Sequence, residues 1–169
     1  MNEKIPLIID TREKIPLFNN GDKDFDIISR KLDTGDYTIL GLENLFIIER
    51  KKDVNELYAC CTSNRRRFYN ELDRMLEYPY RFIIVGSNYS DLLNPFSYKA
   101  TARKYDNFAD ATAKRKAMAI TTSSINGMML KYNVHIIFAG SKCKQVTRNL
   151  LKKFYEYYKK GFFDEQKRN

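Results

Sequence analysis

A chain of 169 residues, 43% of them hydrophobic, is long enough to form one domain around a continuous core. Its 30 lysines and arginines outnumber 21 aspartates and glutamates, and the resulting formal net charge of +9 makes nucleic acid the first macromolecular partner to consider. Neither a signal peptide nor an apolar run of the roughly 18 residues needed to cross a bilayer can be identified, so we expect a cytoplasmic protein without membrane contact.

Short β-type runs come first along the chain. Four of them, at residues 5–10, 25–31, 37–40 and 45–50, are separated by the Gly, Asn and Asp clusters typical of turns. A helix opens at residues 53–57, and after a break at 62–64 a second helix is expected to extend to about Glu77. The apolar run at residues 81–86 then predicts a strand that is buried on both faces.

The second half of the chain is predicted to be mainly helical. Residues 87–111, rich in Asn, Ser, Pro and Lys, predict a long functional or mobile loop. A helix at about 111–132, a strand at 134–139 and an amphipathic helix at about 141–160 are expected to follow. We expect the core stripe of the last helix to be Cys143, Val146, Leu150, Phe154 and Tyr157.

This order of elements predicts an α/β fold in which helices flank both faces of a central mixed sheet. Residues 1–161 are expected to form the single domain, and residues 162–169 a charged and frayed C-terminal tail. Cys60, Cys61 and Cys143 lack the spacing of a zinc or redox motif, so we expect them to be small buried side chains. His135, the only histidine, is expected to be structural, which argues against a Ser-His-Asp hydrolase.

Three acidic residues stand at the ends of predicted strands. Asp10 ends the first strand, Asp36 opens the third after Gly35, and Glu49 interrupts the apolar end of the fourth. A buried acid must be paired or bind a cation, and Mg²⁺ prefers carboxylate oxygens. The three acids therefore predict a metal site that could polarise a phosphodiester.

Lys51 follows two residues after Glu49, and residues i and i+2 of a strand project from the same face. Acid and amine are thus expected in one site, where the lysine could orient water or neutralise charge on the phosphate. Arg50, on the opposite face of the strand, could support the fold or reach a phosphate from the rim. Each of these residues taken singly fits a turn cap or a solvated charge, but their joint arrangement favours a catalytic site.

The same residues resemble a known family. Gly35-Asp36 followed by Ile48-Glu49-Arg50-Lys51 resembles the GD…ERK motif of the XPF-type (XPF/Rad/Mus/Hef) structure-specific endonucleases. Residues 8–13, IIDTRE, resemble the opening DxRE strand of that family. Residues 57–60 and 64–72 are similar to its helical segment, and residues 131–141 to its small bacterial and phage members. By analogy with these members, the small size of the chain suggests a phage or bacterial origin.

The resemblance implies a nuclease related in fold to restriction endonucleases and dependent on Mg²⁺ or Mn²⁺. It implies that Asp10, Asp36 and Glu49 surround the metal and that Lys51 is catalytic. Glu13 matches the acid of the opening motif and Arg50 the arginine of the ERK triplet, so we count both as further candidates.

One position departs from the family pattern. The aspartate that usually follows the ERK triplet falls here on Asn55. Asp53 and Glu56 are the neighbouring acids, and which residue replaces the aspartate is left open.

Larger members of the family carry a tandem helix-hairpin-helix module, which this sequence lacks. DNA is then expected to contact the domain itself, a homodimer or a partner protein, and the family resemblance implies pairing through the nuclease domain. The predicted DNA contacts are Arg65, Arg66 and Arg67 at a helix start and Lys99, Arg103 and Lys104 in the basic loop, which continues with Lys114, Arg115 and Lys116.

Three functions follow from this reading. The first is an endonuclease acting on branched, flapped or junction DNA. The second is a non-catalytic DNA-binding module of the same fold. The third is a restriction-type nuclease that cuts linear duplex DNA with the same catalytic core.

Overall fold

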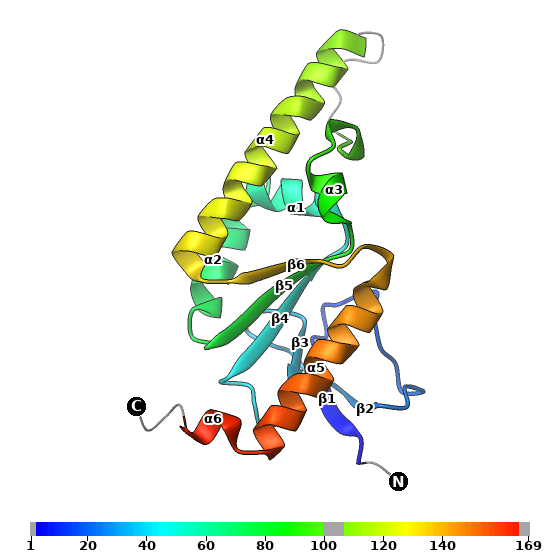
Figure 1. Ribbon diagram of the computed structural model, residues 1–169, viewed down its shortest axis with the longest axis vertical. Helices are drawn as coiled ribbons and strands as arrows, with labels where there is room; N and C mark the ends of the chain where they lie inside the picture. Colours follow the sequence, from blue (N-terminus) through cyan, green and yellow to red (C-terminus); the bar gives the residue numbers. More distant parts are fainter. Residues whose placement is uncertain (1–2, 100–106, 166–169) are drawn as a thin grey trace.

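One six-stranded mixed sheet organises the chain in the computed structural model, which describes residues 3–99 and 107–165 (Figure 1). In chain order the strands are β1 (Ile5–Ile9), β2 (Phe25–Ser29), β3 (Tyr37–Ile39), β4 (Phe46–Lys51), β5 (Tyr80–Val85) and β6 (His135–Phe138). They lie in the order β2-β1-β3-β4-β5-β6, with β3 antiparallel to both neighbours and every other pair parallel. The predicted mixed sheet is confirmed.

Helices connect the strands and cover the sheet. Those between β4 and β6 are α1 (Val54–Cys61), α2 (Arg65–Met75), α3 (Tyr89–Leu92), the 3-10 helix η1 (Pro95–Ser97) and α4 (Asn107–Tyr132). After β6 come η2 (Gly140–Lys142), α5 (Cys143–Lys159) and α6 (Phe162–Glu165). Helix α4 is long and extends well beyond the sheet (Figure 1). Helix α5 packs on the face of the sheet opposite to α1, α2 and α4.

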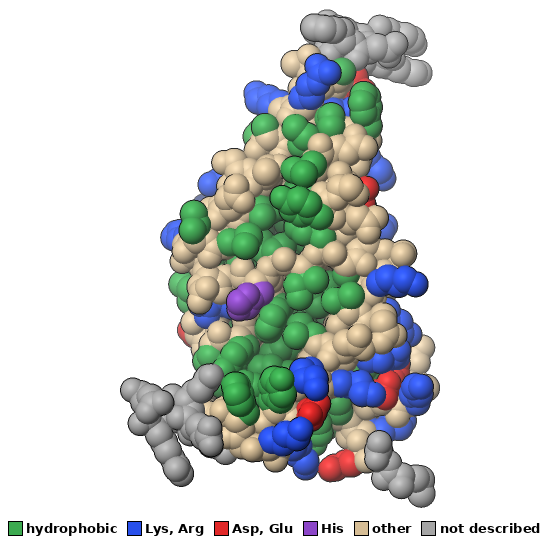
Figure 2. Space-filling view, viewed as in Figure 1, with side chains coloured by type: hydrophobic (Ala, Val, Ile, Leu, Met, Phe, Trp, Pro, Cys, Tyr) green, Lys and Arg blue, Asp and Glu red, His purple; other side chains and the backbone are tan. Residues whose placement is uncertain are grey.

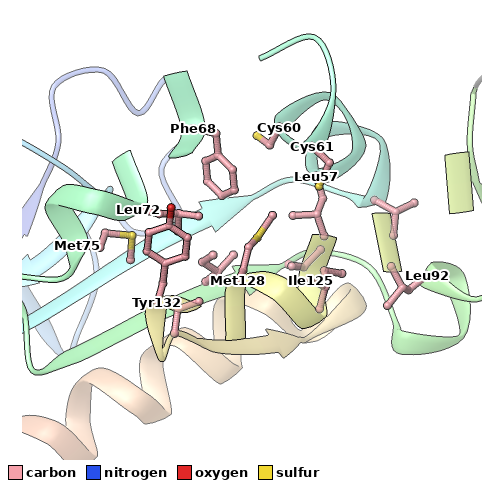
Figure 3. Packing of buried hydrophobic residues seen from close by; sticks show 14 of the residues in the cluster. Leu57, Cys60, Cys61, Phe68, Leu72, Met75, Leu92, Ile125, Met128 and Tyr132 are labelled. Atoms are coloured by element: carbon pink, nitrogen blue, oxygen red, sulfur yellow. The ribbon is translucent and has the colours of Figure 1, made fainter. Parts of the chain in front are cut away.

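Side chains of the sheet alternate between two cores. In β4, Ile47 joins the core formed with α1, α2 and α4, whereas Phe46 and Ile48 belong to the core formed with α5. Figure 3 shows the first core, in which Phe68 of α2 lies among apolar side chains of α1 and α4. By the same alternation Glu49 and Lys51 face α1 and α2, and Arg50 faces the opposite side.

The prediction of one long loop at residues 87–111 is wrong, because the described part of that stretch contains α3, η1 and the start of α4. Asn88 and Asp91 form a capping box that starts α3, and the Asn94 side chain accepts from the Phe96 amide to start η1. Asparagine favours turns and helix caps for the same physical reason, so these residues indicated a loop where they begin helices.

The core stripe predicted for α5 is also wrong in part. Its buried residues are Cys143, Thr147, Leu151 and Phe154, whereas Val146 and Leu150 are half-buried and Tyr157 is 41% exposed. Thr147 can be buried because its hydroxyl donates to the Cys143 carbonyl at 2.8 Å. A polar residue thereby occupies a position that hydrophobicity alone would not assign to the core.

The stretch expected to be a frayed tail begins instead with α6. Phe163 is only 6% exposed, and its ring lies 4.6 Å from Phe154 and 4.9 Å from Tyr80 between ring centres. Aromatic packing therefore anchors residues just past Gly161 to the second core.

The expectations for the cysteines and for β5 are met in the described chain. All three cysteines are buried and free, and Ile83, Ile84 and Val85 of β5 are fully buried. His135 is exposed and stacks on Phe82 with 5.2 Å between ring centres. Among the helices that the structure describes, none is long and apolar enough to cross a membrane.

Candidate active site

Backbone hydrogen bonds bring the predicted acids to neighbouring strand ends. The Asp10 amide donates to the Asp36 carbonyl at 2.9 Å, and the Asp36 amide donates to the Ile48 carbonyl at 2.8 Å. Asp10, Asp36 and Glu49 consequently line one cavity of about 430 Å³, together with Lys51. We call it the acid cavity.

Gly35 explains why Asp36 can lie so close to β4. Its φ is +73°, and a Cβ atom there would lie 2.4 Å from Ile47 Cγ1 and 3.1 Å from the Ile48 carbonyl oxygen. Only glycine fits this close approach without displacing the strand. The Gly-Asp pair is thus a backbone requirement as well as a chemical one.

Glu49 and Lys51 form a buried ion pair. Each is 5% exposed, and Lys51 Nζ lies 2.5 Å from Glu49 Oε1 and 4.5 Å from the centre of the Phe68 ring. Burial would lower the pKa of Lys51, but the attraction of Glu49 outweighs burial and the pKa is raised, so the amine is an ammonium. Burial raises the pKa of Glu49 well above its usual value, and repulsion from Asp36 contributes.

The carboxylates leave acceptor capacity for a cation. Glu49 Oε2 is buried and has no hydrogen-bond partner among the described residues. Asp36 Oδ2 accepts from the Arg50 amide at 2.7 Å, while burial, with the charge of Glu13, raises the pKa of Asp36 to about 7. A divalent cation would satisfy the free oxygen and favour both charged carboxylates, so these residues fit Mg²⁺ or Mn²⁺.

Asp10 lines the cavity, but its carboxylate is fully engaged. Oδ1 accepts from the Arg12 amide at 2.7 Å and from Arg12 Nε at 2.8 Å, while Oδ2 accepts from Arg12 Nη2 at 3.0 Å and from the Leu32 amide at 2.6 Å. These bonds hold the chain after β1 and lower the pKa of Asp10 in spite of its burial. A metal contact by Asp10, as predicted, would therefore compete with four hydrogen bonds.

Glu13 and Arg50 meet at the rim of the acid cavity. Arg50 Nη1 lies 3.6 Å from Glu13 Oε2 and donates to the Ile15 carbonyl at 3.1 Å. Glu13 Oε1 accepts from the Ile15 amide at 2.8 Å. Both residues line the cavity, and Arg50 links it to the segment that follows β1.

The acids near Asn55 serve the start of α1. Asp53 is its N-cap and accepts from the amides of Asn55 and Glu56 at 2.9 Å each. Asn55 donates to the Ser97 carbonyl and accepts from the Lys99 amide, which ties α1 to η1. Of the three positions left open, only Glu56 lines the acid cavity.

Sequence reasoning missed Glu71 of α2. This half-buried acid lines the acid cavity and contributes to raising the pKa of both Asp36 and Glu49. Its carboxylate has no hydrogen bond or ion pair with another described residue. The available signal was its position, since Phe68, Glu71, Leu72 and Met75 follow the i, i+3, i+4, i+7 spacing of a core-facing stripe.

The acids share a cavity without forming a preassembled ligand shell. Within residues 3–99 and 107–165, no three His, Cys, Asp or Glu side chains stand close enough to hold a metal ion together. In addition, Lys51 engages Glu49 Oε1, an oxygen that a metal could otherwise bind.

The predicted DNA-binding cations occupy different environments. Arg65, Arg66 and Arg67 are all exposed. Arg67 lines the acid cavity, and the Arg65 guanidinium lies 4.6 Å from the centre of the Tyr69 ring. Lys99 is exposed, while Arg103 and Lys104 lie outside the described residues. Farther along the basic stretch, Lys114 pairs with Asp110 at 3.0 Å, and Arg115 and Lys116 are exposed.

A mixed sheet with acids and a lysine at adjacent strand ends, flanked by helices, defines a restriction-endonuclease-like nuclease fold. The family model described as the ERCC4 domain matches residues 9–154, and the chain belongs to this family, the XPF-type nuclease domain. The resemblance read from the sequence is therefore confirmed. No curated protein matches the chain.

Two solved structures share this fold. XPF from Aeropyrum pernix in complex with DNA is 18% identical with a TM-score of 0.58, and the match covers 90% of this chain and 66% of that chain. XPF from Aeropyrum pernix in a second structure is 18% identical with a TM-score of 0.55, covering 86% and 64%. The chain thus spans slightly less than two thirds of the length of these relatives.

Proposed function

We propose that this protein is a divalent-metal-dependent DNA endonuclease that hydrolyses phosphodiester bonds in branched, flapped or junction DNA. The observation that carries the proposal is the buried Oε2 of Glu49, which has no hydrogen-bond partner in residues 3–99 and 107–165 and lies in a cavity that Glu49 shares with Asp36 and the ammonium of Lys51. Membership of the ERCC4 domain family supports nuclease chemistry, and one relative of the same fold is described in complex with DNA.

Asp36 and Glu49 would hold Mg²⁺ or Mn²⁺, and Glu71, which lines the same cavity, would have to move closer to them to serve as a third ligand. The bound ion supplies Lewis-acid polarisation of the phosphate and an activated water. Asp10 would support the site indirectly, because its bonds to Arg12 and Leu32 tie the segment after β1 to the segment after β2.

Lys51 acts as a cation rather than as a base, because its pKa is raised. Its ammonium would stabilise the negative charge that grows on the phosphate during hydrolysis. Arg50 and Glu13, paired at the rim, would orient the neighbouring segment of the substrate or of the chain.

DNA contacts are proposed at the exposed cations Arg66, Arg67 and Lys99, with Arg103 and Lys104 following in the same basic stretch. Arg65, held on the ring of Tyr69, is the member of the predicted triplet whose charge is directed elsewhere. A strand carrying one negative charge per phosphate would bind such residues with an affinity that falls steeply as salt rises.

Pairing with a second copy or a partner protein through the nuclease domain also belongs to this proposal. Figure 2 shows hydrophobic side chains gathered along the face formed by α4 and β6. Met129 and Leu130 of α4 are 47% and 87% exposed, as expected of a surface that another chain could cover.

The test is a cleavage assay on labelled duplex, flap and four-way junction DNA with Mg²⁺, with Mn²⁺ and with EDTA. We expect metal-dependent cleavage of the branched substrates and a loss of about 100-fold or more in rate for Asp36→Asn. Binding without cleavage would favour the non-catalytic module, and preferred cutting of linear duplex the restriction-type nuclease. Unimpaired cleavage by Asp36→Asn would refute the site.

A further inference from the structure

A second groove runs along α2 beside the acid cavity. It has a volume of about 430 Å³ and is lined by Ser63, Asn64, Arg66, Arg67, Asn70 and Arg74. We call it the arginine groove. Asn64 and Arg67 line both the acid cavity and the arginine groove, so the two hollows adjoin.

The groove is strongly positive. Three of its six lining residues are arginines, and none of the six is acidic. Arg66 and Arg67 form no ion pair with any residue in the described ranges, and Arg74 donates its Nε to the Asp33 carbonyl at 3.1 Å, leaving its terminal nitrogens for another acceptor. Unneutralised guanidinium groups beside one another favour a polyanionic ligand.

The positions of these residues on α2 suit an extended ligand. Arg66, Asn70 and Arg74 recur every four residues and so lie along one side of the helix. With a helical rise of about 1.5 Å per residue, Arg66 and Arg74 stand roughly 12 Å apart along the axis. One strand of B-DNA carries a phosphate about every 3.4 Å of axis, so this length spans about three phosphates.

The core fixes which side of α2 is available. Phe68, Leu72 and Met75 are buried against the sheet side of the molecule, which presents the arginines outward. Arg65 departs from this arrangement, because its guanidinium lies over Tyr69, whose ring packs 5.9 Å from that of Tyr132. Sequence neighbours Arg65 and Arg66 therefore differ in their surroundings, since Arg66 lines the groove and Arg65 does not.

We propose that the arginine groove binds the sugar-phosphate backbone of one DNA strand, about three phosphates long, on one side of the bond placed in the acid cavity. Arginine and asparagine side chains both donate to phosphate oxygens. The neighbouring acid cavity is lined by acidic and basic side chains in equal number, whereas the lining of the groove is basic without an acid, so the groove offers the stronger attraction for a phosphate chain. The placement of the cleaved bond in the acid cavity rests on the proposed nuclease function, whereas the binding of a DNA strand in the groove does not.

The experiment measures binding in EDTA, where cleavage cannot occur. Fluorescence anisotropy with a labelled single-stranded DNA oligonucleotide gives the affinity at several salt concentrations for the wild type, the double variant Arg66→Ala/Arg74→Ala and the matched control Arg65→Ala. Each lost phosphate contact should flatten the plot of log affinity against log salt by about 0.7, so the double variant should flatten it by roughly 1.4. Arg65→Ala should retain the wild-type slope.

Two further variants separate charge from folding. Arg66→Lys/Arg74→Lys keeps the charge and should retain most of the slope, and a thermal melt of each protein reports whether it is folded. An unchanged slope in a folded Arg66→Ala/Arg74→Ala protein would refute the groove as a DNA-binding site. An equally large loss of slope in Arg65→Ala would refute it as well. Tighter binding of RNA of the same sequence would overturn its assignment to DNA.

Cleavage is then measured separately with Mg²⁺. If the double variant loses binding while the wild type cuts no DNA, the groove stands and the proposed nuclease function falls. If the wild type cuts DNA and the double variant binds and cuts equally well, the function stands and the groove falls.

Discussion

Lys51 Nζ lies between Glu49 Oε1, at 2.5 Å, and the ring of Phe68, whose centre is 4.5 Å away. One ammonium thereby joins the acid of β4 to the aromatic core beneath α2. The pair is buried, so neither charge can be removed without leaving the other uncompensated in a medium of low dielectric constant.

Lys51→Met should abolish cleavage and destabilise the protein in a pH-dependent way. Removing one partner of a buried ion pair costs about 3–5 kcal/mol when the other stays charged. The raised pKa of Glu49 lets it take up a proton in acid, so the loss should be smaller at pH 5 than at pH 8. Urea unfolding at both pH values measures this difference, with Lys51→Arg as the charge-preserving control. An equal loss at both pH values would contradict the pairing.

The stability of the metal-free protein should fall as pH rises through about 7. The pKa of Asp36 is raised from 3.8 to about 7, so folding favours its protonated form. Its contribution to stability is present in full below its unfolded pKa and is lost as pH rises through the folded value. Melting temperatures in EDTA between pH 5 and 8.5 should show this decline, and Asp36→Asn should flatten it. Mg²⁺ should restore stability at pH 8, because it binds the charged form.

Asp10→Asn should affect stability more than metal binding. The amide cannot accept all four bonds that Asp10 receives from Arg12 and Leu32, and an unsatisfied buried donor costs about 1–3 kcal/mol. Calorimetric titration with Mn²⁺ should give an affinity near that of the wild type, in contrast to Asp36→Asn. A stable Asp10→Asn protein that no longer binds Mn²⁺ would restore Asp10 as a ligand.

Glu71→Gln should weaken metal binding or cleavage by about 10-fold to 100-fold, the range seen for residues that support a metal site. It should also lower the pKa of Asp36, since the charge of Glu71 contributes to raising it, and so shift the pH profile of cleavage toward acid. Glu77→Gln removes an exposed acid just past the same helix and is the matched control. Wild-type cleavage with an unshifted profile would leave Glu71 without a role.

Much of the fold could be predicted from the sequence because the strands carry local signals. β-Branched runs mark β1, β4 and β5, the Gly-Asp motif directly precedes β3, and the Glu-Arg-Lys motif ends β4. Helices α3 and η1 could not be predicted, because the asparagines that cap them are equally common in loops.

The candidate site could be predicted only in part because two features depend on distant residues. Glu71 reaches the acid cavity from α2, and its place on an apolar stripe was the only local indication. Asp10 is engaged by the Leu32 amide, 22 residues away, and no local pattern indicates that bond. The spacing of the motifs predicted which residues share the cavity. The hydrogen-bond partners of each carboxylate oxygen could be seen only in the folded structure.

Helix α2 supplies Glu71 and Arg67 to the cavity and holds Lys51 with the ring of Phe68. The eleven residues of this helix therefore decide whether the site exists at all. Detachment of α2 would release the lysine and remove an acid, and it would also expose Phe68, Leu72 and Met75 of the first core. On warming, the site should therefore be lost together with the core, and amide exchange in α2 should be as slow as in the central strands.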